Sequence, residues 1–231
     1  MLEVEGLNLA YGQSRILHDV SLTAPVGQVT TVMGTNGVGK TSLLRALSGR
    51  HPYTAGTVML DGVPLAHPTA AQAARAGVAY VPQGREVFPL LSVAENLETG
   101  FACLPKAERT VPDWIFDLFP VLAEMRHRRG GDLSGGQQQQ LAIARALVTK
   151  PRVLLLDEPT EGIQPSVIQQ IGRAIAQLRD RGDMAIVLVE QNVDFAWGAA
   201  DSFVMMKRGA VWRRMAKAQS SRDEVVAALA L

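Results

Sequence analysis

The sequence contains a single cysteine, Cys103, and no long apolar segment. One thiol cannot form an internal disulfide, which fits a protein that works in a reducing compartment. No apolar run approaches the roughly 20 residues that a helix needs to cross a bilayer. The first residues carry acids and lack a basic start followed by an apolar core, so they do not predict a signal peptide. We therefore expect a soluble or peripheral protein that would reach a membrane only through a partner.

The sequence also lacks an excess of charge of either sign, with 23 Lys and Arg against 22 Asp and Glu. Proteins that hold nucleic acid neutralise phosphates with clustered basic residues. The net charge of +1 therefore favours a function without a nucleic-acid partner. A length of 231 residues suits one α/β domain with room for a smaller inserted subdomain.

Three largely apolar runs predict buried strands, at residues 29–33, 153–156 and 186–189, and the last two are wholly apolar. A helix that begins at Pro165 is expected between the second and the third, which is typical of a parallel sheet covered on both faces. Residues 92–150 have a mostly helical pattern. Earlier in the chain, Asp61-Gly62 after a short strand predicts a hairpin turn.

An anion-binding loop follows the first apolar run. The pattern G-x-x-x-x-G-K-[ST] fits residues 34–41, directly before a predicted helix. Its glycines let backbone N–H groups converge on phosphate oxygens, and the helix N-terminus adds positive potential. We expect Lys40 to bind the outer phosphates of ATP and the Thr41 hydroxyl to bind Mg²⁺. The predicted nucleotide-binding residues here are Gly34, Thr35, Asn36, Gly37, Val38, Gly39, Lys40, Thr41 and Ser42.

Two acids end the second apolar run. Asp157 is expected on the metal side of the phosphates, through water, and Glu158 is expected to orient or deprotonate the attacking water. Alone, such a strand end more often meets solvent; together with the phosphate loop, the catalytic interpretation is favoured.

A second phosphate-type helix start lies at residues 133–137, Leu-Ser-Gly-Gly-Gln. Ser134 can cap the helix that follows, and two glycines leave N–H groups open to an anion. Ser-Gly-Gly is also a common loop-to-helix start. Because residues 34–41 already serve the phosphates, a second site makes sense if two such domains close around nucleotide. Its predicted ATP contacts are Ser134, Gly135, Gly136 and Gln137.

These motifs, in this order, resemble the ATP-binding subunits of ABC transporters over essentially the whole chain. The resemblance implies an α/β P-loop NTPase with a mixed sheet core, an antiparallel β subdomain and an inserted helical subdomain. It implies one domain, 1–231, with residues 1–83 and 149–231 as the core and residues 84–148 as the helical part that carries the signature.

The same resemblance assigns further roles. Tyr11 is similar to the aromatic residue that stacks on adenine, and Gln83 to the glutamine that touches Mg²⁺ or water and relays its state to the permease. From the residues alone, strand packing and a polar loop would be the simpler interpretations. The resemblance also implies a head-to-tail dimer, in which the phosphate loop of one subunit faces Ser134, Gly136 and Gln137 of the other.

Two positions depart from the family pattern. Gln164 stands where an aspartate is usual, and Gln191 stands where a histidine is usual. Glutamine can hydrogen-bond a γ-phosphate or water, but it cannot carry a proton as histidine does. We therefore expect Glu158 to be the principal catalytic residue and Gln191 to sense the γ-phosphate.

These departures resemble the branched-chain amino acid and urea importers. Residues 81–88, VPQGREVF, support that group, and residues 128–140 and 157–166 are most similar to the E-type ATPase of urea importers. Urea is thus the first expectation and a branched-chain amino acid or short amide the alternative. The resemblance implies a peripheral subunit on the cytoplasmic face of the inner (plasma) membrane. Its implied partners are a second ATPase subunit, permease subunits and, indirectly, a solute-binding protein.

Phe88 and Pro89 are candidates for the groove that receives a permease helix; core packing of Phe88 is the alternative. Three other classes fit less well. A soluble ABC ATPase usually has two nucleotide domains or long insertions, and a P-loop kinase or GTPase has no use for residues 133–137. A binding-only domain does not need Lys40, Asp157 and Glu158 together.

Overall fold

The computed structural model describes residues 1–230, and its central element is a six-stranded sheet. The strand order is β10-β9-β3-β8-β7-β6, and all neighbours are parallel except β10, which pairs antiparallel with β9. The sheet is therefore mixed, as predicted. Its strands are β3 (Val29–Met33), β6 (Val78–Val81), β7 (Val153–Asp157), β8 (Ala185–Val189), β9 (Ser202–Lys207) and β10 (Ala210–Ala216).

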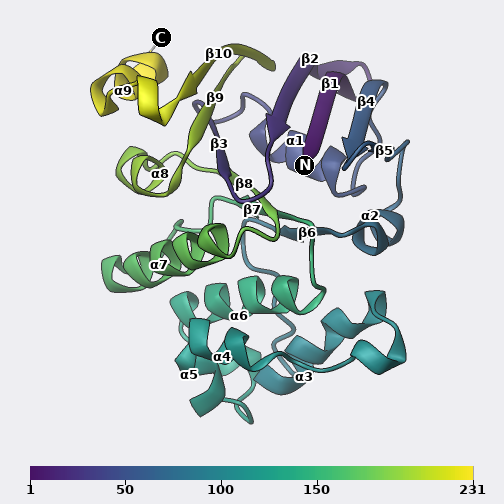
Figure 1. Cartoon of the computed structure of the whole chain (residues 1–231), viewed down its shortest axis with the longest axis vertical. Coiled ribbons are helices and arrows are strands. Elements are labelled where there is room, and N and C mark those ends of the chain that lie inside the picture. The colour runs from purple at the N-terminus through teal and green to yellow at the C-terminus, as the bar shows by residue number, and fades with distance from the viewer. Residues whose placement is uncertain (231) are drawn as a thin grey trace.

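A second, antiparallel sheet of four strands lies at one end of the molecule (Figure 1). Its order is β2-β1-β4-β5. The turn between β4 and β5 is the predicted Asp61-Gly62 hairpin, with both residues in the left-handed region at φ 50° and 76°. The strands are β1 (Leu2–Tyr11), β2 (Ser14–Ala24), β4 (Ala55–Leu60) and β5 (Val63–Pro64).

Helices cover both faces of the six-stranded sheet (Figure 1). Helix α1 lies between the two sheets, whereas α3 to α7 lie on the opposite side. None of the helices among residues 1–230 is long and apolar enough to cross a membrane. They are α1 (Lys40–Leu47), α2 (Ala70–Ala76), α3 (Val93–Glu98), α4 (Asp113–Leu118), α5 (Pro120–Glu124), α6 (Gly135–Val148), α7 (Pro165–Arg181), α8 (Val193–Ala199) and α9 (Arg222–Ala230).

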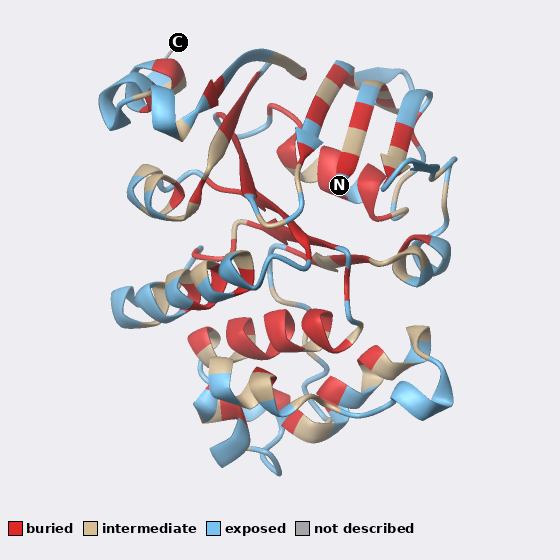
Figure 2. Cartoon of the chain, viewed as in Figure 1, coloured by how far each residue is buried: buried red, intermediate tan, exposed pale blue. Residues whose placement is uncertain are grey.

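The apolar core is continuous through the sheet because successive strand residues point to opposite faces. In β7, Val153 and Leu155 pack toward α1 and the antiparallel sheet, whereas Leu154 and Leu156 pack toward α6 and α7. All four side chains are fully buried, as are the side chains of β3 and β8 (Figure 2). Two buried faces explain why these strands have no polar alternation.

Within residues 92–150, whose pattern is mostly helical, α5 is short and ends at Glu124. Residues beyond it turn back to the start of α3, where the N–H groups of Val93 and Ala94 donate to the carbonyl oxygens of Arg128 and Arg126 at 2.9 and 3.0 Å. The first N–H groups of a helix have no partner within it. The chain after α5 supplies those partners and leaves the helical conformation to do so.

Candidate active site

The phosphate loop lies between the end of β3 and the start of α1. Gly39 is the N-cap of α1 in the left-handed conformation, φ 101°, and a Cβ there would lie 2.7 Å from the side chain of Leu17. A Cβ at Gly34 would lie 2.4 Å from the carbonyl oxygen of Met206. Only glycine fits at both positions. No acid stands in the first turn of α1, so the helix N-terminus keeps its positive potential for an anion.

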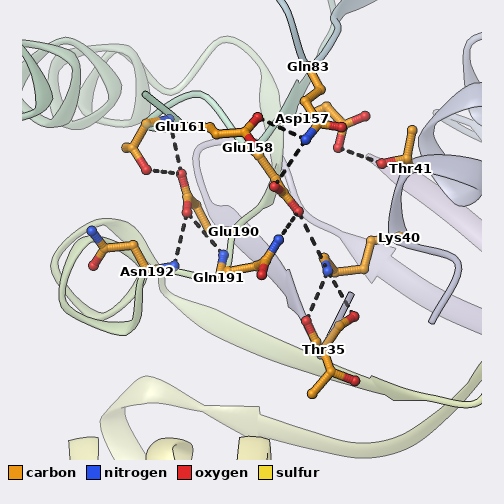
Figure 3. A network of polar contacts seen from close by, with 12 residues as sticks. Thr35, Lys40, Thr41, Gln83, Asp157, Glu158, Glu161, Glu190, Gln191 and Asn192 are labelled. Carbon is orange, nitrogen blue, oxygen red and sulfur yellow. Dashed lines mark hydrogen bonds and ion pairs between the residues drawn. The ribbon is translucent and has the colours of Figure 1, made fainter. Parts of the chain in front are cut away.

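Lys40 places a buried cation at the centre of this loop. Its side chain is 4% exposed, and Nζ donates to the carbonyl oxygens of Gly34 and Thr35 at 2.9 and 3.1 Å. The same nitrogen lies 3.6 Å from Glu158 Oε1 (Figure 3). The charge is therefore held beside both the loop and the acid that follows β7.

A cleft of about 310 Å³ opens at this point. Its wall combines six of the nine predicted P-loop residues with Tyr11, Gln83 and Glu158, which come from three other segments of the chain. The ring of Tyr11 is 39% exposed and lies 4.2 Å from the ring of His51. The full lining is Tyr11, Ile16, Asn36, Gly37, Gly39, Lys40, Thr41, Ser42, Gln83 and Glu158.

Asp157 is a buried carboxylate with two side-chain donors. Thr41 Oγ1 donates to Oδ1 at 3.2 Å, and the Tyr80 hydroxyl donates to Oδ2 at 2.9 Å. Burial raises the pKa of Asp157 above its ordinary value, while the bonds from Tyr80 and Thr41 act in the opposite direction. Burial also raises the pKa of Tyr80, and the neighbouring Asp157 adds to that effect.

The oxygens of Thr41 and Asp157 fit one edge of a Mg²⁺ site. Hard oxygen ligands suit this ion, which is often bound by one or two protein groups together with substrate phosphates and water. No group of three or more His, Cys, Asp or Glu residues within 1–230 could hold a metal by itself. The donor set therefore fits an ion that arrives with nucleotide.

Glu158 stands at the junction of three segments. Its backbone is in the left-handed region, φ 47°, and its N–H donates to the carbonyl oxygen of Val189 at 2.9 Å. Its Oε1 accepts a hydrogen bond from Gln191 Nε2 at 2.6 Å, and its Oε2 lies 3.5 Å from Gln83 Nε2 (Figure 3). Gln83 Nε2 donates over a shorter distance, 2.8 Å, to Glu161 Oε2. The two predicted glutamines thus flank the predicted base.

Gln164, the other departure, lies apart from this group. It precedes α7 as its N-cap, and its side chain makes no capping hydrogen bond. It does not line the cleft.

The predicted signature residues form a different surface. Ser134 Oγ accepts from the N–H of Gln137 at 3.4 Å, and Gln137 Oε1 accepts from the N–H of Ser134 at 2.8 Å, so α6 begins with the predicted cap. Gly136 is buried, and a Cβ there would lie 2.8 Å from Val167 Cγ1 on α7. Ser134, Gly135, Gly136 and Gln137 do not line the cleft that holds the P-loop.

Sequence reasoning missed two residues of this network, Tyr80 and Glu190. Tyr80 is the third residue of β6, a strand too short and too ordinary to signal a role. Glu190 directly follows the apolar residues of β8, just as Asp157 directly follows the apolar residues of β7. This similarity in sequence could have identified Glu190. It is 2% exposed and hydrogen-bonds the segments on both sides of the site.

Comparison with known proteins shows the family to which the chain is related. A family described as "ABC transporter" matches residues 17–161. The chain is 41% identical over 212 residues to the high-affinity branched-chain amino acid transport ATP-binding protein BraG of Pseudomonas aeruginosa, covering 91% of each chain. It is 38% identical to a probable branched-chain amino acid transport ATP-binding protein, LivF, of Archaeoglobus fulgidus, covering 91% of this chain and 90% of LivF.

Solved structures show the same fold. A nucleotide-free ATP-binding cassette from an ABC transporter superposes with a TM-score of 0.85 at 22% identity, covering 98% of this chain and 94% of that one. A dimeric bacterial ABC transporter cassette superposes with a TM-score of 0.82 at 23% identity, covering 94% and 99%. The chain belongs to the ABC transporter family. It has the ABC ATPase cassette fold and is an ATP-binding subunit with the character of an ATPase.

Proposed function

We propose that this chain is the ATP-hydrolysing subunit of an ABC importer of small solutes. The observation that carries the proposal is the cleft beside the phosphate loop, which Lys40 and Glu158 both line, with Gln191 hydrogen-bonded to Glu158. The kinship with BraG and LivF supports a role in solute transport. The chain would work at the cytoplasmic face of the inner (plasma) membrane, as a peripheral subunit attached to permeases.

The residues divide the chemistry among them. Loop N–H groups and Lys40 hold the phosphates, and Tyr11 offers an aromatic face for adenine. Thr41, Gln83 and, through water, Asp157 would hold Mg²⁺, which would neutralise negative charge on the phosphates. Glu158 accepts a hydrogen bond from the water that attacks the γ-phosphate and withdraws its proton. Gln191 holds the Glu158 carboxylate and donates a hydrogen bond toward the γ-phosphate.

The signature residues act on the nucleotide of a second ATPase subunit. Support comes from their absence from this chain's own cleft and from the kinship with a cassette solved as a dimer. In such a dimer, Ser134, Gly135, Gly136 and Gln137 face the partner's phosphate loop. The second subunit is either another copy or a related ATPase. Residues 84–148 form the helical subdomain that carries this surface.

A groove of about 340 Å³ is the proposed docking site of a permease helix. Phe88 on its wall is 48% exposed, which supports docking over core packing, and Leu90 nearby is 79% exposed. The guanidinium of Arg145 lies 5.3 Å from the centre of the Phe88 ring. The groove therefore offers an apolar surface beside a cation.

The relatives favour a branched-chain amino acid over urea as the solute. BraG and LivF are both named for branched-chain amino acid transport, which matches the alternative rather than the first expectation from sequence. The stretch at 161–166, Glu-Gly-Ile-Gln-Pro-Ser, keeps urea as the second candidate. The solute never contacts the ATPase, so only the assembled transporter distinguishes the two.

The proposal is tested by purifying the tagged full chain from native membranes and identifying the proteins that accompany it. We expect permease subunits and a second ATPase, and a solute-binding protein under mild conditions. The complex in proteoliposomes should then hydrolyse ATP faster with leucine and its binding protein than with urea and its binding protein. Recovery without a membrane protein would contradict the importer function; stimulation by urea alone would reverse the choice of solute.

A further inference from the structure

Glu190 is a buried carboxylate whose hydrogen-bonding capacity is filled by two separate loops. It is 2% exposed, and burial raises its pKa. Its Oε1 accepts from the N–H and hydroxyl of Thr160 at 3.2 and 2.6 Å. Its Oε2 accepts from the N–H groups of Gln191 and Asn192 at 3.0 and 3.1 Å. Each oxygen therefore binds one loop, and the carboxylate joins the two (Figure 3).

The first loop contains Glu158, two residues before Thr160. Glu158 has a left-handed backbone, which a residue with a side chain adopts only when its surroundings hold it there. The N–H of Glu161 donates to the Glu158 carbonyl oxygen at 3.2 Å and closes a turn around Pro159 and Thr160. The bond from Thr160 to Glu190 anchors this turn from inside the protein.

The second loop contains Gln191, the residue directly after Glu190. Two consecutive backbone N–H groups point at one carboxylate oxygen, which fixes the path of the chain at Gln191. Asn192 then caps α8 by accepting from the N–H of Phe195 at 3.1 Å. The side chain of Gln191 is left to reach Glu158 at 2.6 Å.

We propose that Glu190 is a positioning residue that holds Glu158 and Gln191 in register by joining the two loops that carry them. The inference rests on the proposed function, in which Glu158 acts on the attacking water beside Gln191. Glu190 is 2% exposed and does not line the cleft. It acts by setting the distance between the side chains of Glu158 and Gln191.

The Thr160 hydroxyl is the most selective point at which to test this link. Thr160→Val removes the 2.6 Å bond to Glu190 and keeps the size and branching of the side chain, whereas Thr160→Ser keeps the hydroxyl. If this bond holds Glu158 in place, we expect Thr160→Val to lower kcat by about tenfold or more, with the Kd for ATP changed by less than about threefold. Thr160→Ser should retain most of the turnover.

Thr31→Val is a matched control, because Thr31 is also fully buried and its hydroxyl has no hydrogen-bond partner within the described chain. Turnover is measured on the full chain co-purified with its native partners, well below the melting temperature of each variant. Thr31→Val should leave kcat unchanged.

Glu190→Gln and a cycle with Gln191→Ala complete the test. Whichever way the new amide faces, its NH₂ group meets a backbone N–H donor, so one loop is released and kcat should fall by at least tenfold. Because Glu190 acts through Gln191 and Glu158, the losses of Thr160→Val and Gln191→Ala should combine to less than their product. Fully multiplicative losses, or a lowered melting temperature with unchanged kcat, would overturn the inference. Full turnover of Glu158→Gln would instead contradict the proposed function, so the two failures are distinguishable.

Discussion

Removing the Tyr80 hydroxyl is expected to destabilise the fold in a way that depends on pH. Tyr80→Phe deletes the 2.9 Å hydrogen bond to Oδ2 of Asp157, a carboxylate that is 1% exposed. A hydrogen bond to a charged group contributes about 1.5 to 3 kcal/mol, and a neutral one about 1 kcal/mol. The free energy of unfolding should therefore fall by about 2 kcal/mol where Asp157 is ionised and by about 1 kcal/mol where it is protonated.

The sign follows from the pKa of Asp157. Burial raises this pKa in the folded state above the ordinary value of 3.8, so stability is lost as pH rises from that value through the folded pKa. The Tyr80 bond limits this rise in pKa. Its removal raises the pKa of Asp157 further and extends the loss to higher pH. The destabilisation by Tyr80→Phe should accordingly be larger at pH 8 than at pH 5.

Urea unfolding at both pH values measures the effect. Tyr53→Phe is the matched control: Tyr53 is 4% exposed, and its hydroxyl bonds only neutral backbone groups, the Leu65 carbonyl oxygen and the His67 N–H, at 3.2 and 3.0 Å. It should lose about 2 kcal/mol, about 1 kcal/mol for each bond, at both pH values. A Tyr80→Phe loss that is equal at both, or larger at pH 5, would refute the ionised, buried Asp157 on which this reasoning depends.

Two further predictions concern stability. Thr31→Val should raise the free energy of unfolding by about 1 kcal/mol, because it removes a buried hydroxyl without a partner; a lower melting temperature would show that the hydroxyl is satisfied in solution. Gly136→Ala should lower it by about 1 to 3 kcal/mol, although alanine favours helix, because the new methyl group would lie 2.8 Å from Val167 Cγ1. The control is the double variant Gly136→Ala with Val167→Ala, whose melting temperature should be higher than that of Gly136→Ala alone. Gly135→Ala is a less informative control, because its new methyl group would meet the flexible Arg85 guanidinium.

Three strands of the central sheet, β3, β7 and β8, could be predicted from their apolar sequences. β3 matches the expected range, and β7 and β8 each differ from their expected ranges by one residue. The match is close because the limits of an apolar run mark the limits of a strand that is buried on both faces. Strands β6, β9 and β10 were not predicted. Of these, β10 is an edge strand and carries Arg213 and Arg214 on exposed positions, so its sequence has no apolar period to recognise.

The P-loop was predictable for a similar reason, since backbone geometry restricts its residue types at fixed spacing. The network around Glu158 was not. The parallel register pairs Asp157 with Val189, so Glu158 and Glu190 leave the sheet side by side. Residues 158 and 190 are distant in sequence, and only the strand order and register bring them together. The sequence alone therefore identifies the two acids, but their proximity becomes visible only when the register of β7 and β8 is known.

The most direct test of the account is ATP binding and hydrolysis by Glu158→Gln, with Glu98→Gln on the exposed face of α3 as the control. The variant keeps the size of Glu158 and its place beside Lys40 and Gln191 but cannot accept a proton. We predict that it binds ATP as tightly as the unaltered chain or more tightly, and that its kcat falls by about 100-fold or more, as expected when a general base is lost. Turnover equal to that of Glu98→Gln would contradict the assignment of Glu158 as the catalytic base.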